Sequence, residues 1–218
     1  ADLRGKLSVS ELKRSDQEEE EGEVLYPEEE IVPYIPAFMQ ETKPLGAAAR
    51  GTAYHRALEC LDFQGLYHSE RVREELARLV EEGRMTKEQE KAVRPYDIYV
   101  FAQSALAKRM AKARKQKAFF TEQPFVIRIP ANELYPERKS REPILVQGII
   151  DAYFYEENEN GDREIVITDY KTDYVKTEEE LLERYKKQLD YYGLALERLT
   201  GLRVREKLIY SFCLGREI

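Results

Sequence analysis

Two acidic residues and one lysine, each at the end of an apolar run, are the residues of this chain that could do chemistry together. Asp169 and Lys171 follow the run 165–168, and Asp151 follows an earlier run, 144–150. Because every second side chain of an extended strand points to the same face, Asp169 and Lys171 share a face. Neighbouring strands that carry carboxylates, with a lysine beside one of them, indicate a divalent-metal site.

The turn between the two runs predicts how the acids meet. Residues 158–162, Asn-Glu-Asn-Gly-Asp, favour an antiparallel hairpin. Asp151 begins its outgoing arm and Asp169 ends the returning one, so both lie at the end far from the turn. Converging carboxylates repel each other unless a cation or proton intervenes. Mg²⁺ takes one or two carboxylates together with waters and phosphate oxygens, which suits hydrolysis of a phosphodiester in a nuclease centre.

The alternative to a metal site is a hairpin with a solvated Asp–Lys pair on its rim. Either strand alone favours that alternative, and the two together favour the site. An ammonium at Lys171 would position the attacking water and offset charge on the reacting phosphate.

Hydrophobic periodicity predicts the elements that position these residues. Helices are predicted over 46–61, 66–83, 86–93, 95–117 and 177–199, strands over 119–130, 144–155, 164–170 and 207–214, and a loop over 131–141. The order, helices followed by β-β-β-α-β, predicts a mixed α/β core behind a helical prefix.

The first predicted helix carries a histidine beside small residues. Gly51 costs about 0.8–1 kcal/mol relative to alanine in a helix interior, so we expect another segment to approach its backbone closely. His55 lies four residues further on the same face. A lone histidine is more often a packed, hydrogen-bonded residue than a ligand, and His68 is expected at the surface.

Composition indicates a soluble globular protein with a heavily charged surface. The 218 residues are 42% hydrophobic and 35% charged, with a formal net charge of −7, so the global field would not attract nucleic acid. Any DNA binding must then come from local basic patches, from metal ions or from a larger assembly. The predicted helix face of Lys108, Lys112 and Lys115 is one candidate patch, and a solvated face is the default. The acidic stretch 16–30 is expected to be a linker, with a DNA mimic or docking tail as the alternative.

Other sequence features bound the location and cofactors. The apolar runs are shorter than the roughly 18 residues of a membrane helix, and no membrane partner is expected. Cys60 and Cys213 give no zinc or iron–sulfur spacing. They are expected to be reduced core residues of a cytoplasmic protein, with a disulfide as the alternative. The chain does not begin with Met, which favours a segment of a longer polypeptide.

Several motifs, in order, resemble those of RecB-type nucleases in the PD-(D/E)XK superfamily. They are the G-x-x-x-H helix at 51–55, the strand at 122–125, the hairpin signature at 148–151 and 169–173, and the Q-x-x-x-Y helix at 185–192. The resemblance covers residue 46 to the C-terminus. It implies a restriction-endonuclease-like core, a mixed central sheet flanked by helices, with a helical N-terminal extension.

The resemblance also implies roles for individual residues. His55, Asp151, Asp169 and the carbonyl of Tyr170 would ligate Mg²⁺, with Mn²⁺ as an alternative ion, and Lys171 would assist the attacking water.

The resemblance implies a second group of site residues, on the Q-x-x-x-Y helix. Gln188, Tyr192 and Tyr185 would hold the DNA backbone or support the site; Gln188 and Tyr192 are one helical turn apart.

Within the superfamily, the chain resembles the nuclease domain of AddA-type subunits of bacterial AddAB helicase–nucleases. This implies processing of single-stranded DNA ends during double-strand-break repair, a helicase part in the same polypeptide and an AddB-type partner subunit. No iron–sulfur cluster is expected, and no ATP site, because G-x-x-x-x-G-K-[ST] does not occur. A free-standing nuclease and a non-catalytic DNA-end-binding scaffold are the alternatives.

The expected organisation is an extended acidic arm over 1–45 and a nuclease domain over 46–218. That domain divides into a mostly helical part, 46–117, and a β-β-β-α-β core, 118–218.

Overall fold

A computed structural model describes residues 6–9, 46–66, 68–135 and 140–218 of the chain. Within the predicted arm only 6–9 belong to the described residues, and they include a short strand, β1 (Lys6–Ser8); the acidic stretch lies outside them. Among the helices described, none combines the length and hydropathy that crossing a bilayer requires.

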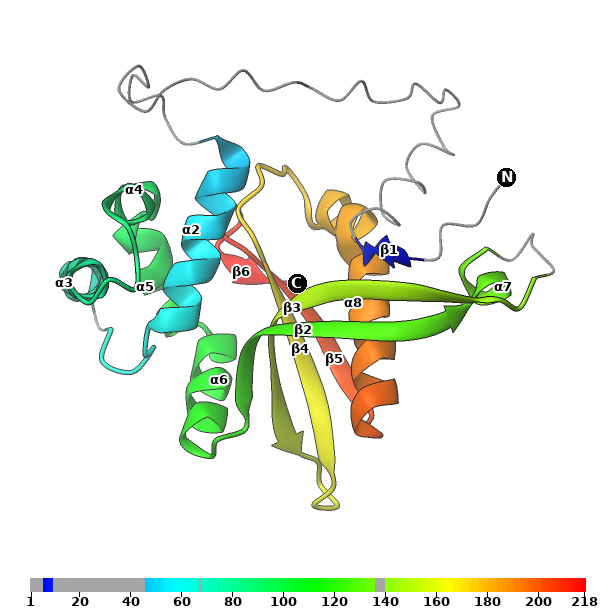
Figure 1. Cartoon of the computed structure of the whole chain (residues 1–218). Helices are drawn as coiled ribbons and strands as arrows, with labels where there is room; N and C mark the ends of the chain where they lie inside the picture. Colours follow the sequence, from blue (N-terminus) through cyan, green and yellow to red (C-terminus); the bar gives the residue numbers. More distant parts are fainter. Residues whose placement is uncertain (1–5, 10–45, 67, 136–139) are drawn as a thin grey trace, which may run out of the picture.

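In the described part of the chain, six strands form one mixed sheet (Figure 1). They are β1, β2 (Phe119–Pro130), β3 (Pro143–Glu157), β4 (Arg163–Lys171), β5 (Val204–Ser211) and β6 (Arg216–Glu217). β2, β3 and β4 form an antiparallel meander, whereas β1 runs parallel to β3 and β5 parallel to β4. The predicted mixed α/β class is confirmed.

The two edges of β3 pair with different strands. β2 lies along one edge, from Pro143 to Phe154. On the other edge, β1 pairs with residues 145–147 and β4 with residues 152–157. The segment 148–151, which ends in Asp151, therefore lies between β1 and β4, and no described strand pairs with it on that edge.

Helices cover both faces of the sheet (Figure 1). One apolar core includes residues of α2 (Ala47–Cys60), α3 (Ser69–Glu81), α5 (Pro95–Gln103) and α6 (Ala105–Lys115), with Ala92 of α4 (Lys87–Ala92) packed against it. A second core includes residues of α8 (Glu178–Thr200). Side chains of β4 point alternately to the two faces of the sheet and so contribute to both cores. Val166 and Tyr170 pack in the first core, and Ile165 and Ile167 pack in the second. The sheet thus separates the helical prefix from α8.

Three predicted elements differ from the structure. The strand predicted over 207–214 is β5, which runs from Val204 to Ser211, so residues 212–214 lie in a turn after it. The single helix predicted over 95–117 is two helices, broken at Ser104, whose backbone is extended (φ −62°, ψ 158°). Ser104 Oγ accepts a hydrogen bond from Ala107 N at 3.0 Å, so the serine caps α6, a role that this residue type favours. The predicted loop over 131–141 begins with one helical turn, α7 (Ala131–Leu134).

Other local predictions can be checked at single residues. Thr86 forms a capping box with Gln89 at the start of α4, and Gly201 ends α8 in the left-handed conformation with φ 71°. His68 is exposed, as expected, and its Nδ1 caps α3 by accepting from Arg71 N at 3.2 Å. Cys60 is buried as predicted, but the prediction that Cys213 lies in the core is wrong, because that residue is exposed at the turn after β5.

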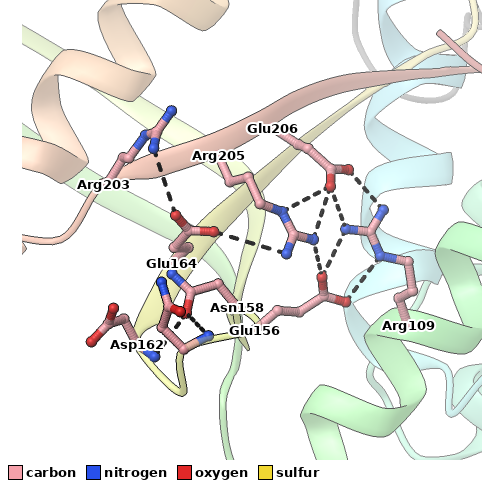
Figure 2. A network of polar contacts seen from close by, with 9 residues as sticks. Arg109, Glu156, Asn158, Asp162, Glu164, Arg203, Arg205 and Glu206 are labelled. Atoms are coloured by element: carbon pink, nitrogen blue, oxygen red, sulfur yellow. Dashed lines mark hydrogen bonds and ion pairs between the residues drawn. The ribbon is translucent and has the colours of Figure 1, made fainter.

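An ionic network ties α6 to β3 and β5 (Figure 2). Arg109 donates to Glu156 twice at 2.9 Å and to Glu206 at 2.8 and 3.1 Å. Arg205 contacts the same two glutamates. The hydrogen bonds from Arg109 lower the pKa of Glu156 and of Glu206. Because β4 lies between β3 and β5, the network holds three strands against the helical layer.

Substitution by alanine should destabilise the fold at Gly148 and stabilise it at Gly51. A Cβ at Gly148 would lie 2.8 Å from Phe125 Cε1 and 3.2 Å from Val9 Cγ2, whereas one at Gly51 would lie 3.5 Å from Thr172 Oγ1, an ordinary contact. We expect Gly148→Ala to lower the free energy of unfolding by about 1–3 kcal/mol through overpacking. Gly51→Ala should raise it by about 0.5–1 kcal/mol. Thermal denaturation measures both, and shifts of the same sign would contradict this packing.

Replacing Arg109 by methionine should destabilise the fold in a pH-dependent way. At neutral pH we expect a loss of about 1–3 kcal/mol, because two carboxylates lose charged donors. Their folded-state pKa values lie below the unfolded value of about 4.3, so this stabilisation is present above that pH and is lost as the pH falls through the folded values.

Chemical denaturation on both sides of that pH measures the effect. Arg203→Met is the control, since Arg203 is 79% exposed at the rim of the same network (Figure 2). A difference between the parent chain and Arg109→Met that persists unchanged in acid would contradict the ionic origin.

Candidate metal centre

β3 and β4 separate where the two predicted acids meet. Their last pair at this end is Ala152 with Thr168. Beyond it, the backbone amide of Tyr170 donates to Asp151 Oδ2 at 2.9 Å, so a side chain of β3 replaces its backbone as the acceptor. β4 stays paired with β5 as far as Lys171. The result is a fork between β3 and β4, and the predicted register, with both acids far from the turn, is confirmed.

α2 brings His55 to this fork from the side of the helical prefix. His55 Nε2 lies 2.9 Å from the carbonyl oxygen of Tyr170, and Nδ1 lies 3.5 Å from Asp151 Oδ1. We assign the ring proton to Nε2 because a carbonyl faces it, which leaves the lone pair of Nδ1 directed at the carboxylate. The helix therefore directs an imidazole nitrogen at a buried acid.

α8 reaches the fork from the opposite face of the sheet. Gln188 Nε2 donates to Asp169 Oδ1 at 3.0 Å and to the hydroxyl oxygen of Tyr192 at 2.7 Å. Asp169 is fully buried, and Lys171 Nζ lies 2.6 Å from its Oδ2. In the described part of the chain, no hydrogen bond reaches that oxygen besides this ion pair.

A second contact from α8 fixes the lysine. Lys171 Nζ lies 4.4 Å from the centre of the Tyr185 ring, a cation–π contact. The Tyr185 hydroxyl in turn donates to Asp173 Oδ2 at 2.9 Å. Tyr185 and Tyr192 are both buried, so the structure places the predicted support residues beneath the acids rather than on an open surface.

Burial and mutual charge set the protonation states at the fork. Burial, and then the charge of Asp169, raise the pKa of Asp151 well above its ordinary value. Burial lowers the pKa of His55, which keeps the ring neutral. Burial also opposes the charge of Lys171, but the nearby Asp169 and Asp151 outweigh it and raise the pKa of the lysine. The lysine is thus charged, and the raised pKa of Asp151 indicates that this one positive charge does not offset the cost of ionising both acids.

The structure adds one residue to which the sequence analysis gave no role. Glu122 of β2 points at the same place: its Oε1 lies 3.9 Å from His55 Nδ1, and ligand atoms of His55, Glu122 and Asp151 all lie within 4.8 Å of one another. Asp169 is not part of this group of three. Glu122 falls within the strand motif 122–125, so the sequence could have indicated a role in the site from the acidic residue type at this position. Its backbone φ of 49° could not be read from the sequence.

The residues at the fork fit a divalent cation. A neutral imidazole and carboxylate oxygens are ligands that hard or borderline divalent ions accept. A metal-binding histidine usually donates its second ring N–H to a carbonyl or carboxylate, as His55 does to Tyr170. The buried acids, with an Asp169 oxygen that has only the lysine as a partner, leave negative charge for a cation to neutralise.

Comparison with known proteins agrees with this geometry. The family model described as the PD-(D/E)XK nuclease superfamily matches residues 31–214. An ATP-dependent helicase/nuclease subunit from Clostridium botulinum strain 657 is 39% identical over 219 residues, which cover 98% of this chain and 16% of the relative. The same-named protein of strain Alaska E43 is 38% identical over 232 residues, covering 99% and 18%. The chain therefore spans less than a fifth of the length of these relatives.

Adding Mg²⁺ or Mn²⁺ should stabilise the folded chain, and Asp151→Asn should remove that effect. An ion at about 100 times its dissociation constant adds about 2.7 kcal/mol to the free energy of unfolding. Without metal, Asp151→Asn should be more stable than the parent chain, because it removes a buried charge beside Asp169 while its amide oxygen can still accept from Tyr170 N.

Thermal denaturation with and without metal measures both effects. Asp190→Asn is the matched control, an exposed acid of α8 paired with Lys207. A metal-dependent rise that survives Asp151→Asn would place the ion elsewhere.

Proposed function

The chain belongs to the PD-(D/E)XK nuclease superfamily, and on that premise we propose that it hydrolyses phosphodiester bonds of DNA with Mg²⁺, or Mn²⁺ in its place. One observation carries the proposal: the fork between β3 and β4 gathers Asp151, Asp169 and Lys171 from the hairpin and His55 from α2. These are an acid pair, a cation and an imidazole at one buried position.

In this proposal, His55, Asp151 and Asp169 hold the ion. The carbonyl of Tyr170 is a fourth candidate through its second lone pair, since its first is engaged by His55 Nε2. When bound, a divalent cation supplies charge to stabilise the reacting phosphate and lowers the pKa of water. Gln188 keeps Asp169 in place by donating to Oδ1, which leaves Oδ2 directed at Lys171.

In this proposal, Lys171 is the side chain that acts on the attacking water and the phosphate. Its ammonium is held between Asp169 and the ring of Tyr185, with a raised pKa, so it is protonated at neutral pH. From there it orients the attacking water and offsets negative charge that develops on the phosphate oxygens. Tyr192 supports Gln188, and Tyr185 supports Lys171. In this proposal, the sugar-phosphate backbone of DNA is contacted on the side of the fork that these residues leave open.

The longer context is also proposed. The relatives are named ATP-dependent helicase/nuclease subunits, so we propose that this chain is the nuclease part of such a polypeptide, working with an AddB-type partner on single-stranded ends during double-strand-break repair. A helicase that delivers the strand would explain how a chain with a net charge of −7 acts on DNA. The exposed lysines of α6, Lys108, Lys112 and Lys115, are candidates for phosphate contacts.

Cleavage of end-labelled single-stranded DNA tests the proposal directly. The chain should degrade DNA with Mg²⁺ and not with a chelator, and Asp169→Asn should lower the rate by at least about 100-fold, the usual scale for a group that stabilises developing charge. Asp190→Asn should cleave like the parent chain.

The outcomes separate the alternatives. Cleavage by the chain at a rate that a helicase part does not increase would favour a free-standing nuclease. Metal-dependent DNA binding without any Asp169-dependent cleavage would contradict the proposal and favour an end-binding scaffold.

A further inference from the structure

We propose that Tyr174 stacks on a base of single-stranded DNA beside the fork, and that Lys176 contacts a phosphate of the same strand. The inference rests on the proposed function and deepens it, because it names the residues through which the metal centre selects unpaired strands. Its support is the position of the segment that carries both residues, the exposure of their side chains and their distance from the reacting groups.

Residues 172–177 connect β4 to α8 and cross from one helical layer to the other (Figure 1). Near the start of this segment, Thr172 Oγ1 lies 3.5 Å from the place that a Cβ of Gly51 in α2 would take. One residue further, Asp173 accepts a hydrogen bond from the Tyr185 hydroxyl of α8 at 2.9 Å. The segment therefore borders the fork where β4 ends, between the two helices that reach the acids.

Tyr174 is held outward by its two neighbours in the chain. Asp173 is tied to Tyr185. Val175 is 3% exposed in the core beneath α8, and its carbonyl accepts a hydrogen bond from the Cys213 thiol at 3.5 Å. Tyr174 is 78% exposed, the largest fraction among the exposed large hydrophobic side chains of the described residues, and none of those residues makes a hydrogen bond or ring contact with its side chain. Packing does not explain this tyrosine, and its ring is accessible to a ligand.

Lys176 adds a cation on the same side of the segment. Residues 174 and 176 are exposed on either side of the buried Val175, as in an extended chain. The Lys176 amide donates to Glu180 Oε2 at 3.0 Å, which fixes the backbone, whereas its ammonium has no ion pair with a described residue. Proteins that bind single strands combine aromatic rings, on which bases stack, with cations that contact the phosphates.

The pair lies close enough to the fork to contact the strand that is being cut. Three Cα–Cα steps of about 3.8 Å separate Tyr174 from Lys171, so these two Cα atoms are at most about 11 Å apart. Since nucleotides rise about 3.4 Å each along one stacked strand, a base on Tyr174 belongs to a nucleotide within about three of the reacting phosphate. Inside a duplex, neighbouring bases cover both faces of a base, and unstacking it costs free energy. The pair therefore favours DNA that is already single-stranded.

Steady-state cleavage of a single-stranded oligonucleotide tests the role of the ring. The loss of one base–aromatic stack corresponds to about 5–150-fold in affinity, so we expect Tyr174→Ala to raise KM by an amount in this range. The value of kcat should change by less than about threefold, because a contact that is equal in the ground and transition states affects KM alone. Tyr174→Phe keeps the ring and should stay close to the parent chain.

Two controls separate stacking from a general change in the protein. Leu199→Ala removes another exposed apolar side chain, about 16 Å along the axis of α8 from Gln188, and should leave KM unchanged. An oligonucleotide with intact phosphates but no bases should have the same KM with the parent chain and with Tyr174→Ala. Because both side chains are exposed, neither alanine variant should lower the melting temperature.

A tryptophan at this position reports the contact without relying on catalysis. The chain contains no tryptophan, so Tyr174→Trp introduces a single fluorophore, and Leu199→Trp is its control. Both chains also carry Asp169→Asn, so that the strand is bound in Mg²⁺ but cut slowly. A single-stranded oligonucleotide should quench the tryptophan fluorescence of the Tyr174→Trp chain and not that of the Leu199→Trp chain. The strand without bases should quench neither.

Lys176 is tested through the salt dependence of the same reaction. On a single strand, each phosphate contact contributes about 0.7 to the slope of log affinity against log salt concentration. We expect Lys176→Gln to make that slope shallower by about this amount, and an unchanged slope would contradict a phosphate contact.

Failure of this inference is distinct from failure of the proposed function. A parent chain without Asp169-dependent cleavage overturns the function. A parent chain that cleaves, together with a parental KM for Tyr174→Ala and no quenching of the Tyr174→Trp chain, leaves the metal centre in place and overturns the role of Tyr174. The exposed ring would then belong to a contact with another part of the longer polypeptide.

Discussion

The candidate site depends on how the backbone of Tyr170 is satisfied after β4 leaves β3. A buried amide and carbonyl without partners are costly, so strands rarely separate inside a core. Here both groups are bound by side chains: Asp151 accepts from the amide, and His55 Nε2 lies at the carbonyl. The residues that open the sheet are therefore those proposed to bind the ion, and the fork would be unstable without them.

This arrangement also explains why side chains from both helical layers reach the same place in the sheet. On the second edge of β4, pairing with β5 continues from Asp169 to Lys171. The fork is consequently open to α2 on one face and to α8 on the other. His55 enters from the first and Gln188 from the second, so each acid is positioned by a different helix. Rigid strands and helices hold the chemistry.

The sequence predicted what local rules determine and missed what depends on tertiary structure. Turn residues at 158–162 set the hairpin register, and that register placed Asp151 beside Asp169. The break at Ser104 was missed because helical periodicity continues across it, although a serine there could have been recognised as a cap. The conformation of Glu122 arises where β2 and β3 exchange their facing between two cores, and no single-strand pattern reports that exchange.

The charges of the molecule are distributed in a way that bears on how it meets a polyanion. Arg109 and Arg205 are committed to glutamates between α6 and the sheet, and Arg78 to nearby acids of α3 and its C-terminal end. These three arginines are thereby neutralised, whereas the lysines of α6 stay exposed and the acids at the fork are only partly compensated. Such a surface does not draw in nucleic acid over long distances. Under the proposed function, DNA at the fork would be bound through short-range contacts, and a divalent ion that reverses the local charge would allow the buried acids to accept a phosphate.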